Sequence, residues 1–403
     1  MVRRIDASER RARLGLRHRL ALRISSCVDV AGDLVGLHSS DAPSVPLAVR
    51  ARTIDVSPAD VEHALYDDRS LARILGMRRT MFVVPVDLVP TIHAACTRAS
   101  APRERTRLVR LLEEAGIADE GARWLKTVEE ATLSALQARG QATAMELSED
   151  VPELREQILF GKGKRWEGKV GVSTRVLFLL ATEGRILRTR PRGSWTSTHY
   201  RWAPLRSWLG VDVDAPPTEP ARTELARRWL ATFGPATFDD LVWWTGWTVS
   251  QTRRVLTRLD PVEVDLEGVT GLVLPHDLGP VDPPSPWVAL LPALDPTVMG
   301  WAKRDWYLAQ HRAALFDRNG NAGPTVWWNG RVVGGWAQRP DGEIVLRLLE
   351  DVGSDAVVAA EAEAARLAEW LGDVRFVPRF RTPLEKELSA SGERSPQQVP
   401  RPS

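Results

Sequence analysis

The chain has 403 residues, of which 43% are hydrophobic and 26% are charged, and its net charge at pH 7 is +2. These values are close to globular averages and exclude a largely disordered chain. The apolar runs are shorter than the roughly 18 residues that span a bilayer, and the N-terminus lacks the apolar core of a signal peptide. We therefore expect a cytoplasmic protein of several domains without a membrane segment.

Two cysteines, Cys27 and Cys96, stand alone in apolar surroundings. Neither has a second cysteine or a histidine at the spacing of a metal site. The chain also lacks a glycine-rich phosphate loop and the spacing of a Ser-His-Asp triad. The sequence therefore predicts no disulfide, no metal site and no cofactor.

The first hundred residues predict helices that are followed by a short β-ribbon. Residues 3–23 intersperse arginines with leucines, as in a basic amphipathic helix that either lies along phosphates or packs its leucines on the next helix. A capped helix is expected over 57–66, a second helix over 70–75, and a strand within 77–85. Helices followed by a β-ribbon are the order of a winged-helix module.

The same order of elements returns after residue 100. Helices are expected over 124–139, from Thr143, and over 171–184, and then two strands within 185–196 that a Pro-Arg-Gly turn connects. The turn makes a basic wing whose side chains suit the spacing of phosphates. The candidate phosphate-binding residues of the wing are Arg188, Arg190, Arg192 and Ser194.

A third set of elements is the clearest helix-turn-helix of the chain. Helices over 225–233, 238–245 and 248–256 follow one another at short spacings, and strands are expected within 262–274. The third of these helices corresponds to a recognition helix, which contacts either DNA or a neighbouring part of the protein. Its candidate DNA-binding residues are Arg253 and Arg254.

The C-terminal third is rich in Trp, Gly and Pro and predicts a β-rich domain. An Asn-Gly pair between two β-rich runs is a strong hairpin signal, and a strand over 344–348 and a helix over 355–371 follow it. Residues from Ser389 onward have the composition of a disordered tail. Asp295 and Asp317 are expected to cap turns or to pair with an arginine, the nearby ones being Arg304, Arg312 and Arg318.

Three passes through the same order of elements, at intervals of about 100 residues, indicate tandem modules. The predicted fold is α+β, with three winged-helix modules followed by a β-rich C-terminal part. The predicted boundaries are 1–100, 101–215 and 216–280 for the modules, 281–388 for the β-rich part and 389–403 for the tail.

Five blocks of the sequence resemble the AlkZ-like (HTH-42) family of winged-helix proteins, whose characterised members are bacterial DNA glycosylases that act on alkylated and crosslinked bases. The blocks are 35–41 (VGLHSSD), 75–81 (LGMRRTM), 191–195 (PRGSW), 291–296 (LPALDP) and 316–324 (FDRNGNAGP). The resemblance covers nearly the whole chain. It implies three winged helices curved around a DNA-sized channel and followed by a β-rich part, with double-stranded DNA, damaged or intact, as the partner. Because three modules in one chain already span a duplex and no long heptad run indicates a coiled coil, we expect a monomer, located at the nucleoid.

Catalysis in this family is associated with a motif of glutamine, apolar residue and glutamine, which follows a Gly-Leu pair and holds the attacking water. The matching positions here are His38, Ser39 and Ser40, so both glutamines are replaced. In the catalytic interpretation His38 accepts a proton from water, Ser40 holds the water, and Asp41 orients the imidazole or stabilises positive charge at the sugar. In the alternative, these residues are polar groups at a helix end, with Ser40 or Asp41 as an N-cap.

The resemblance also includes the basic block at 75–81. Arg78, Arg79 and Thr80 are expected to hold phosphates on either side of an extruded nucleotide, although arginine pairs at strand starts are also common on solvated surfaces. The hairpin tip is expected to wedge into the base stack beside that nucleotide, unless its tryptophan belongs to the core. The tip consists of Trp328, Asn329, Gly330 and Arg331.

Two functional hypotheses remain open from the sequence. The first is a monofunctional DNA glycosylase that hydrolyses the N-glycosidic bond of alkylated or crosslinked bases. The second is a non-catalytic DNA-binding protein, a transcription regulator or a lesion sensor, which the missing glutamines support. Convergence of His38, Ser40 and Asp41 on an open basic channel would favour the enzyme, and burial of the three at a helix cap would favour the binder.

Overall fold

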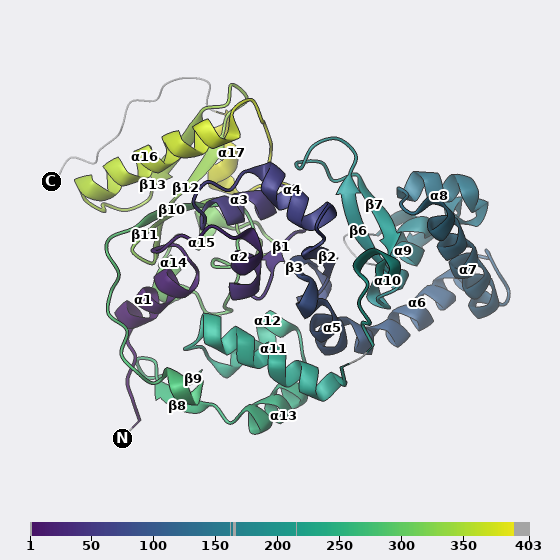
Figure 1. The fold of residues 1–403 in the computed structure, drawn as a ribbon, viewed down its shortest axis with the longest axis horizontal. Coiled ribbons are helices and arrows are strands. Elements are labelled where there is room, and N and C mark those ends of the chain that lie inside the picture. Colours follow the sequence, from purple (N-terminus) through teal and green to yellow (C-terminus); the bar gives the residue numbers. More distant parts are fainter. Residues whose placement is uncertain (1, 162, 164–166, 215, 391–403) are drawn as a thin grey trace.

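The computed structural model describes residues 2–161, 163, 167–214 and 216–390. Helices and small antiparallel sheets alternate along the chain, which confirms the α+β class (Figure 1). In this view the N-terminal part lies at the centre, a lobe made by residues 101–214 lies to its right, and the C-terminal sheet and its long helix lie at the upper left.

Four helices and three strands make up the N-terminal part. Their bounds are α1 (Ala7–Arg17), α2 (Cys27–Asp33), β1 (Leu37–His38), α3 (Ser44–Arg50), α4 (Pro58–Tyr66), β2 (Leu71–Leu75) and β3 (Met81–Pro85). The prediction of a helix over 70–75 is wrong, because this run is strand β2. All five residues of β2 are buried, including Arg73, and a run this short has no periodicity that separates a helix from a strand.

Helix α1 directs arginines into the protein. Arg13 is 1% exposed and donates to Glu9 and Asp277, and Arg17 also donates to Asp277. These ion pairs join α1 to a segment that lies more than 250 residues later in the chain. Part of the basic N-terminal segment therefore packs on protein, through arginines and against a distant segment, whereas the sequence predicts, as one alternative, that its leucines pack on the next helix.

One five-stranded antiparallel sheet contains strands from both of the first two predicted modules. Its strand order is β1-β3-β2-β6-β7, where β6 (Ile186–Pro191) and β7 (Tyr200–Pro204) form the wing. The prediction of both strands within 185–196 is wrong for the second strand, because residues 192–199 form a connection longer than the predicted Pro-Arg-Gly turn. Arg188 of β6 is the register partner of Arg73 of β2. The wing is thus fixed to the N-terminal part as a continuation of its sheet.

The lobe has a helical core of its own. Its further elements are α6 (Ala101–Glu114), α7 (Gly121–Arg139), α8 (Ala144–Asp150), β4 (Gln157–Phe160), β5 (Gly168–Gly171), α9 (Val172–Thr182) and α10 (Leu205–Leu209). Helix α5 (Val89–Ile92) precedes the lobe and contributes to the main hydrophobic core of the molecule. Helix α8 begins after Thr143, as predicted. The Thr143 hydroxyl accepts the backbone N–H of Glu146, whose carboxylate accepts the N–H of Thr143, so the helix has a complete capping box.

The third set of elements follows its prediction closely. It comprises α11 (Thr218–Phe233), α12 (Phe238–Thr245), α13 (Val249–Leu259), β8 (Val262–Asp265) and β9 (Thr270–Val273). Capping boxes start both α12 and α13, with Thr237 and Thr248 as the caps. Helix α11 begins at Thr218, before the predicted 225, because Pro220 falls in its first turn, where a proline is tolerated.

The C-terminal part is a four-stranded antiparallel sheet with the order β10-β11-β12-β13 and helices around it. Its elements are β10 (Val288–Leu291), α14 (Asp305–Leu308), α15 (Arg312–Leu315), β11 (Thr325–Trp328), β12 (Arg331–Gln338), β13 (Ile344–Leu348), α16 (Ser354–Leu371) and α17 (Pro383–Ala390). The predicted hairpin is β11 and β12. Of the predicted tail, residues 389–390 end α17 and residues 391–403 lie outside the described residues.

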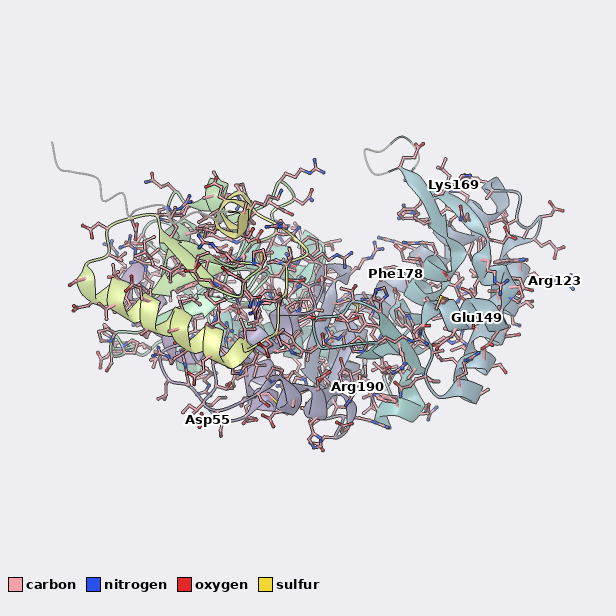
Figure 2. The ribbon with its side chains drawn as sticks, turned by 90° about the horizontal axis from the view of Figure 1, so that it is seen from above. Asp55, Arg123, Glu149, Lys169, Phe178 and Arg190 are labelled. Carbon is pink, nitrogen blue, oxygen red and sulfur yellow. The ribbon has the colours of Figure 1, made fainter. Side chains whose placement is uncertain are left out.

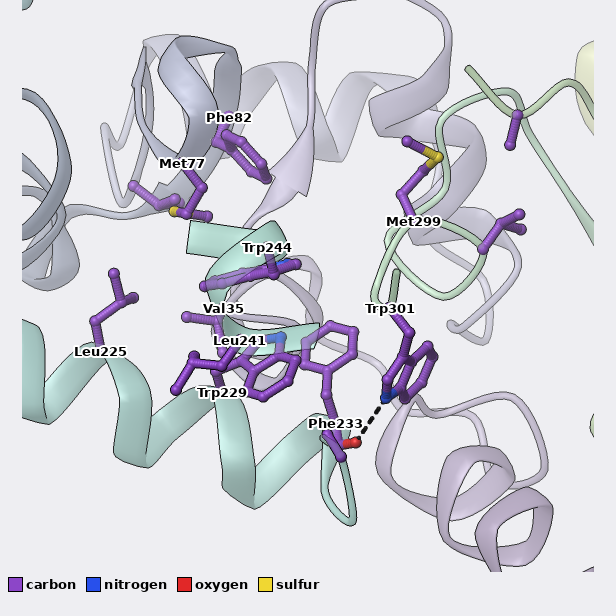
Figure 3. Packing of buried hydrophobic residues seen from close by; sticks show 14 of the residues in the cluster. Val35, Met77, Phe82, Leu225, Trp229, Phe233, Leu241, Trp244, Met299 and Trp301 are labelled. Atoms are coloured by element: carbon purple, nitrogen blue, oxygen red, sulfur yellow. Dashed lines mark hydrogen bonds between the residues drawn. The ribbon is translucent and has the colours of Figure 1, made fainter. Parts of the chain in front are cut away.

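An aromatic cluster joins α11 and α12 to the C-terminal part. The rings of Phe233 and Trp229 stack with centroids 5.9 Å apart, and the ring of Trp301 meets Phe233 edge-on at 5.3 Å (Figure 3). The indole N–H of Trp301 donates to the carbonyl of Phe233 at 3.1 Å. Because Trp301 follows the LPALDP block, this cluster fixes that block against the third set of elements.

Candidate functional site

The HSSD segment lies between β1 and α3 and extends the edge of the shared sheet. His38 ends β1 opposite Phe82 of β3, and the backbone N–H of Ser39 donates to the carbonyl of Met81. The chain then turns into α3, which starts at Ser44. The segment is therefore held on one side by the sheet and on the other by a helix.

His38 is buried, with 6% of its surface exposed, and its ring lies against Phe82. Burial, aided by the positive charge of Arg78, lowers the pKa of His38 to about 3, so the ring is neutral at physiological pH. Nδ1 accepts the backbone N–H of Ser40 in a long contact of 3.4 Å. No described residue is hydrogen-bonded to Nε2.

Asp41 is an anchor of the loop. It is 3% exposed, its Oδ1 accepts the backbone N–H of Arg379 at 3.2 Å, and its Oδ2 lies 3.2 Å from the Ser44 hydroxyl. Burial raises the pKa of Asp41. The same Ser44 hydroxyl donates to the carbonyl of Ala293 at 2.7 Å, so Asp41 and Ser44 together tie the HSSD segment to the LPALDP block.

Ser40 opens on a cavity of about 870 Å³ between the N-terminal part and the lobe. The walls come from the turn and strands around β2 and β3, from α8 and α9, from the wing, and from the segment between α16 and α17. The described lining residues are Ser40, Leu75, Arg79, Thr80, Met81, Thr143, Ala144, Met145, Thr174, Arg175, Leu177, Phe178, Ala181, Arg188, Arg192, Thr198, His199, Tyr200, Trp202 and Arg379.

The cavity wall combines positive charge with aromatic rings. Five arginines and three aromatic residues are among the described lining residues, and no aspartate or glutamate is. Phe178, one of the three, lies on the side of the lobe that faces the rest of the molecule (Figure 2). Cationic side chains suit phosphates, and aromatic faces suit stacked bases.

The arginines of the wall differ in how far carboxylates neutralise them. Arg79 pairs with Glu104 at 2.7 Å, Arg175 lies 3.4 Å from the same carboxylate, and Arg192 pairs with Glu146. Arg188 and Arg379 have no carboxylate within ion-pair distance among the described residues. The positive potential of the cavity is therefore least compensated at these two side chains.

The turn between β2 and β3 is strained and separates its two arginines. Arg78 and Arg79 have φ angles of 53° and 60°, a left-handed conformation that costs energy in residues with side chains. Arg79 and Thr80 line the cavity. Arg78 instead lies 4.1 Å over the ring of Trp243 in α12, where burial lowers its pKa to about 10. The two arginines thus face different surroundings.

The remaining wing and helix residues are more loosely connected to the cavity. Arg190 pairs with Asp67 at 2.9 Å, and the Ser194 hydroxyl is hydrogen-bonded to that of Thr196. Arg253 and Arg254 are exposed on α13 and are not among the described lining residues.

The predicted hairpin wedge is held by the protein itself. The Asn329 side chain accepts the N–H of Trp287, and Arg331 pairs with Glu350 at 2.6 Å. A Cβ at Gly330 would lie 2.5 Å from the Cβ of Arg11, so helix α1 covers the tip. Trp328 is partly buried in the core around the C-terminal sheet. The tip would have to leave these contacts before it reached a base stack.

Several residues of the cavity were not singled out from the sequence. Tyr200 and Trp202 are two residues apart on β7, and this spacing places both rings on one face of a strand, a signal that was available. Arg175 and Phe178 lie on α9 at helical spacing. Arg379 is in an irregular segment 339 residues after Ser40, and no local pattern marks it.

Comparisons with known proteins agree with this arrangement. The family model "DNA glycosylase AlkZ-like" matches residues 31–370. The structure is similar to the Streptomyces sahachiroi DNA glycosylase AlkZ, with a TM-score of 0.71 and 23% identity over 93% of this chain and 98% of that one.

No curated protein matches the sequence. No helix in the described ranges is long and apolar enough to cross a membrane. Within the same ranges, no group of three or more His, Cys, Asp or Glu side chains is arranged to hold a metal ion. On the match of the family model over most of its length, the chain belongs to the AlkZ-like DNA glycosylase family.

Proposed function

We propose that the protein binds double-stranded DNA and hydrolyses the N-glycosidic bond of alkylated or crosslinked bases. The observation that carries this proposal is that Ser40, at the position of the family's second glutamine, opens on a cationic and aromatic cavity. The volume of about 870 Å³ accommodates a nucleotide-sized group. Family membership supports the reaction class.

The residues of the HSSD segment suit a reaction that depends on the position of a water molecule. The bond between C1′ and the base nitrogen breaks, its electron pair leaves with the base, and a water oxygen adds to C1′ while its proton passes to solvent. The Ser40 hydroxyl accepts a hydrogen bond from that water, and the neutral His38 ring, whose Nδ1 accepts the backbone N–H of Ser40, holds Ser40 in position. A cationic alkylated base leaves as a neutral molecule, so this step needs no strong acid.

This chemistry revises the roles predicted for His38 and Asp41. A ring with a pKa of about 3 is a weak base, so His38 acts by orientation rather than by taking up a proton. Asp41, which is bound to Arg379 and Ser44 and is not among the described lining residues, holds the segment in place. Ser40 is the one of the three that lines the cavity.

The architecture supports a modular mode of binding. We propose that residues 1–100, 101–215 and 216–280 act as three winged-helix modules of one monomer, which together follow a duplex at the nucleoid. The third is the most regular, with capped helices α12 and α13 followed by the β8–β9 ribbon. Arg253 and Arg254 on α13 would then contact phosphates outside the cavity.

A second candidate function is DNA binding without base excision. Two observations favour it: the His38 ring is buried, and it is absent from the described lining of the cavity. A protein of this kind would use the same cationic cavity for recognition and leave the base attached.

The decisive experiment measures release of N7-methylguanine and of crosslink-type adducts from treated duplex DNA by mass spectrometry. We expect release by the wild type, and loss of release with retained DNA binding in Ser40→Ala and His38→Ala. Matched controls are Ser207→Ala and His276→Ala, which replace exposed side chains that are not among the described lining residues. Salt-sensitive DNA binding without release of either class of base from the wild type would establish the binder instead.

A further inference from the structure

Three guanidinium groups gather near Ser40: those of Arg188 and Arg379, which line the cavity, and that of Arg73, which is buried beside Arg188. Arg73 and Arg188 are register partners on neighbouring strands, and both lie against the ring of Tyr200, at 4.7 Å and 5.4 Å. The guanidinium of Arg379 donates to the carbonyl of Ser40 at 3.3 Å. Like charges on directly opposed strand residues repel each other, so this arrangement is unfavourable in the free protein.

The positive charge of this cluster is not compensated by a salt bridge. None of the three guanidinium groups has a carboxylate within 4 Å among the described residues, and the Asp41 carboxylate contacts Arg379 only at its backbone N–H. Arg73 is 4% exposed and its Nε has no hydrogen-bond partner. The guanidinium of Arg188 donates to no described residue, and its Nε is also buried without a partner. Burial, together with Arg73 and Arg379, lowers the pKa of Arg188 to about 10.

Other arginines of the cavity provide the contrast. Arg79 and Arg192 each have a glutamate partner within ion-pair distance. Proteins seldom bury a charge without a partner, because the lost hydration is not replaced. A site that keeps two uncompensated guanidiniums at the wall of a cavity, with a third behind them, is prepared for an anionic ligand.

Resting on the proposed function, we propose that Arg188 and Arg379, supported from behind by Arg73, bind a backbone phosphate of DNA next to the HSSD segment. The contact between Arg379 and Ser40 makes this phosphate a neighbour of the proposed water-holding residue. Arg188 and Arg379 are thus positioning residues: by fixing a phosphate they fix the sugar whose C1′ is attacked.

The first test is the salt dependence of binding to an undamaged duplex, measured by fluorescence anisotropy. Each phosphate contact contributes about 0.9 to the slope of log K against log salt. We expect Arg188→Gln and Arg379→Gln each to lower the slope by about this amount, and Arg188→Lys to retain it. The control is Arg123→Gln, at the far end of the lobe from Phe178 (Figure 2), which should leave the slope unchanged.

The second test separates a ligand site from a structural role. If Arg188 is an uncompensated charge, Arg188→Gln does not lower the melting temperature of the free protein. Arg379 is exposed, so Arg379→Gln provides a folded variant in any case. An unchanged slope in both glutamine variants, or an equal fall in Arg123→Gln, would overturn the proposal.

Inorganic phosphate distinguishes the two sources of a phosphate group. A site for the DNA backbone gives a lower slope in the glutamine variants, whether or not free phosphate competes. A site for free phosphate gives a different result: inorganic phosphate stabilises the wild type but not Arg188→Gln, and the slope for DNA is the same in both proteins. That result would refute the DNA assignment. Since binding is measured on undamaged DNA, failure to release a base leaves this test intact.

Discussion

The buried pair of Arg52 and Asp295 gives a sharp prediction about what holds the HSSD segment in place. Both side chains are 0% exposed, and two hydrogen bonds of 2.6 and 2.8 Å join them. Asp295 belongs to the LPALDP block, which contacts Ser44 through the carbonyl of Ala293. The change Asp295→Asn preserves the shape of the side chain and removes its charge.

We expect Asp295→Asn to lower the free energy of unfolding by about 3 to 5 kcal/mol, because it leaves the Arg52 charge buried without a counter-ion. Arg52 would keep its hydrogen bonds to the carbonyls of His18 and Ala48 and to Thr297, which favours the lower end of that range. Urea unfolding followed by tryptophan fluorescence measures the loss.

The matched control is Asp150→Asn, which breaks another bidentate pair, that of Asp150 with Arg139, on the surface of the lobe. Water replaces the lost partner there, so the expected loss is much smaller. The double variant Arg52→Met/Asp295→Leu should recover most of the stability, since it removes both charges. Equal losses in Asp295→Asn and Asp150→Asn would refute the argument that burial sets the magnitude.

Three further predictions concern stability. Burial lowers the folded-state pKa of His18, of His38 (to about 3) and of His93 (to about 4), so only the unfolded chain takes up their protons below about pH 6.5. The contribution of these histidines to the free energy of unfolding is therefore complete above that pH. It should fall on acidification by up to about 1.4 kcal/mol per pH unit for each histidine. Urea denaturation of the wild type and of His93→Asn at several pH values would measure this fall. Trp229→Ala should cost about 3 to 5 kcal/mol in the same urea assay, because the ring is fully buried in the aromatic cluster. Thr143→Ala should lower the free energy of unfolding by about 1 kcal/mol, because it removes the cap of α8. An unchanged free energy of unfolding would contradict a stabilising role of the capping box.

Features with local causes were predictable from the sequence. Caps at Thr143 and Thr248 mark the starts of α8 and α13, because a side-chain oxygen satisfies backbone donors within the same turn. The Asn329-Gly330 pair marks the β11–β12 hairpin, because both residues take positive φ angles there, 47° and 82°. Such signals depend only on residues a few positions apart.

Features that depend on distant partners were not predictable. Asp295 was expected to pair with an arginine near it in sequence, and its partner is Arg52, 243 residues away. The sequence predicts a helix where strand β2 lies, because the neighbours β3 and β6, which make it a strand, are not visible in the local sequence of β2. Arg379 reaches the cavity from the far end of the chain for the same reason.

The wing shows why a count of arginines is a poor guide to a phosphate site. The sequence presents Arg188, Arg190 and Arg192 as equivalent, alternating along one strand and turn. In the fold, Arg190 is paired with Asp67 and Arg192 with Glu146, whereas Arg188 faces other arginines and aromatic rings. With a net charge of only +2, the chain neutralises most of its arginines itself. Under the proposed function, Arg188 and Arg379 are available to a DNA phosphate, because the fold brings them to the cavity beside Ser40 without placing a carboxylate against their guanidinium groups.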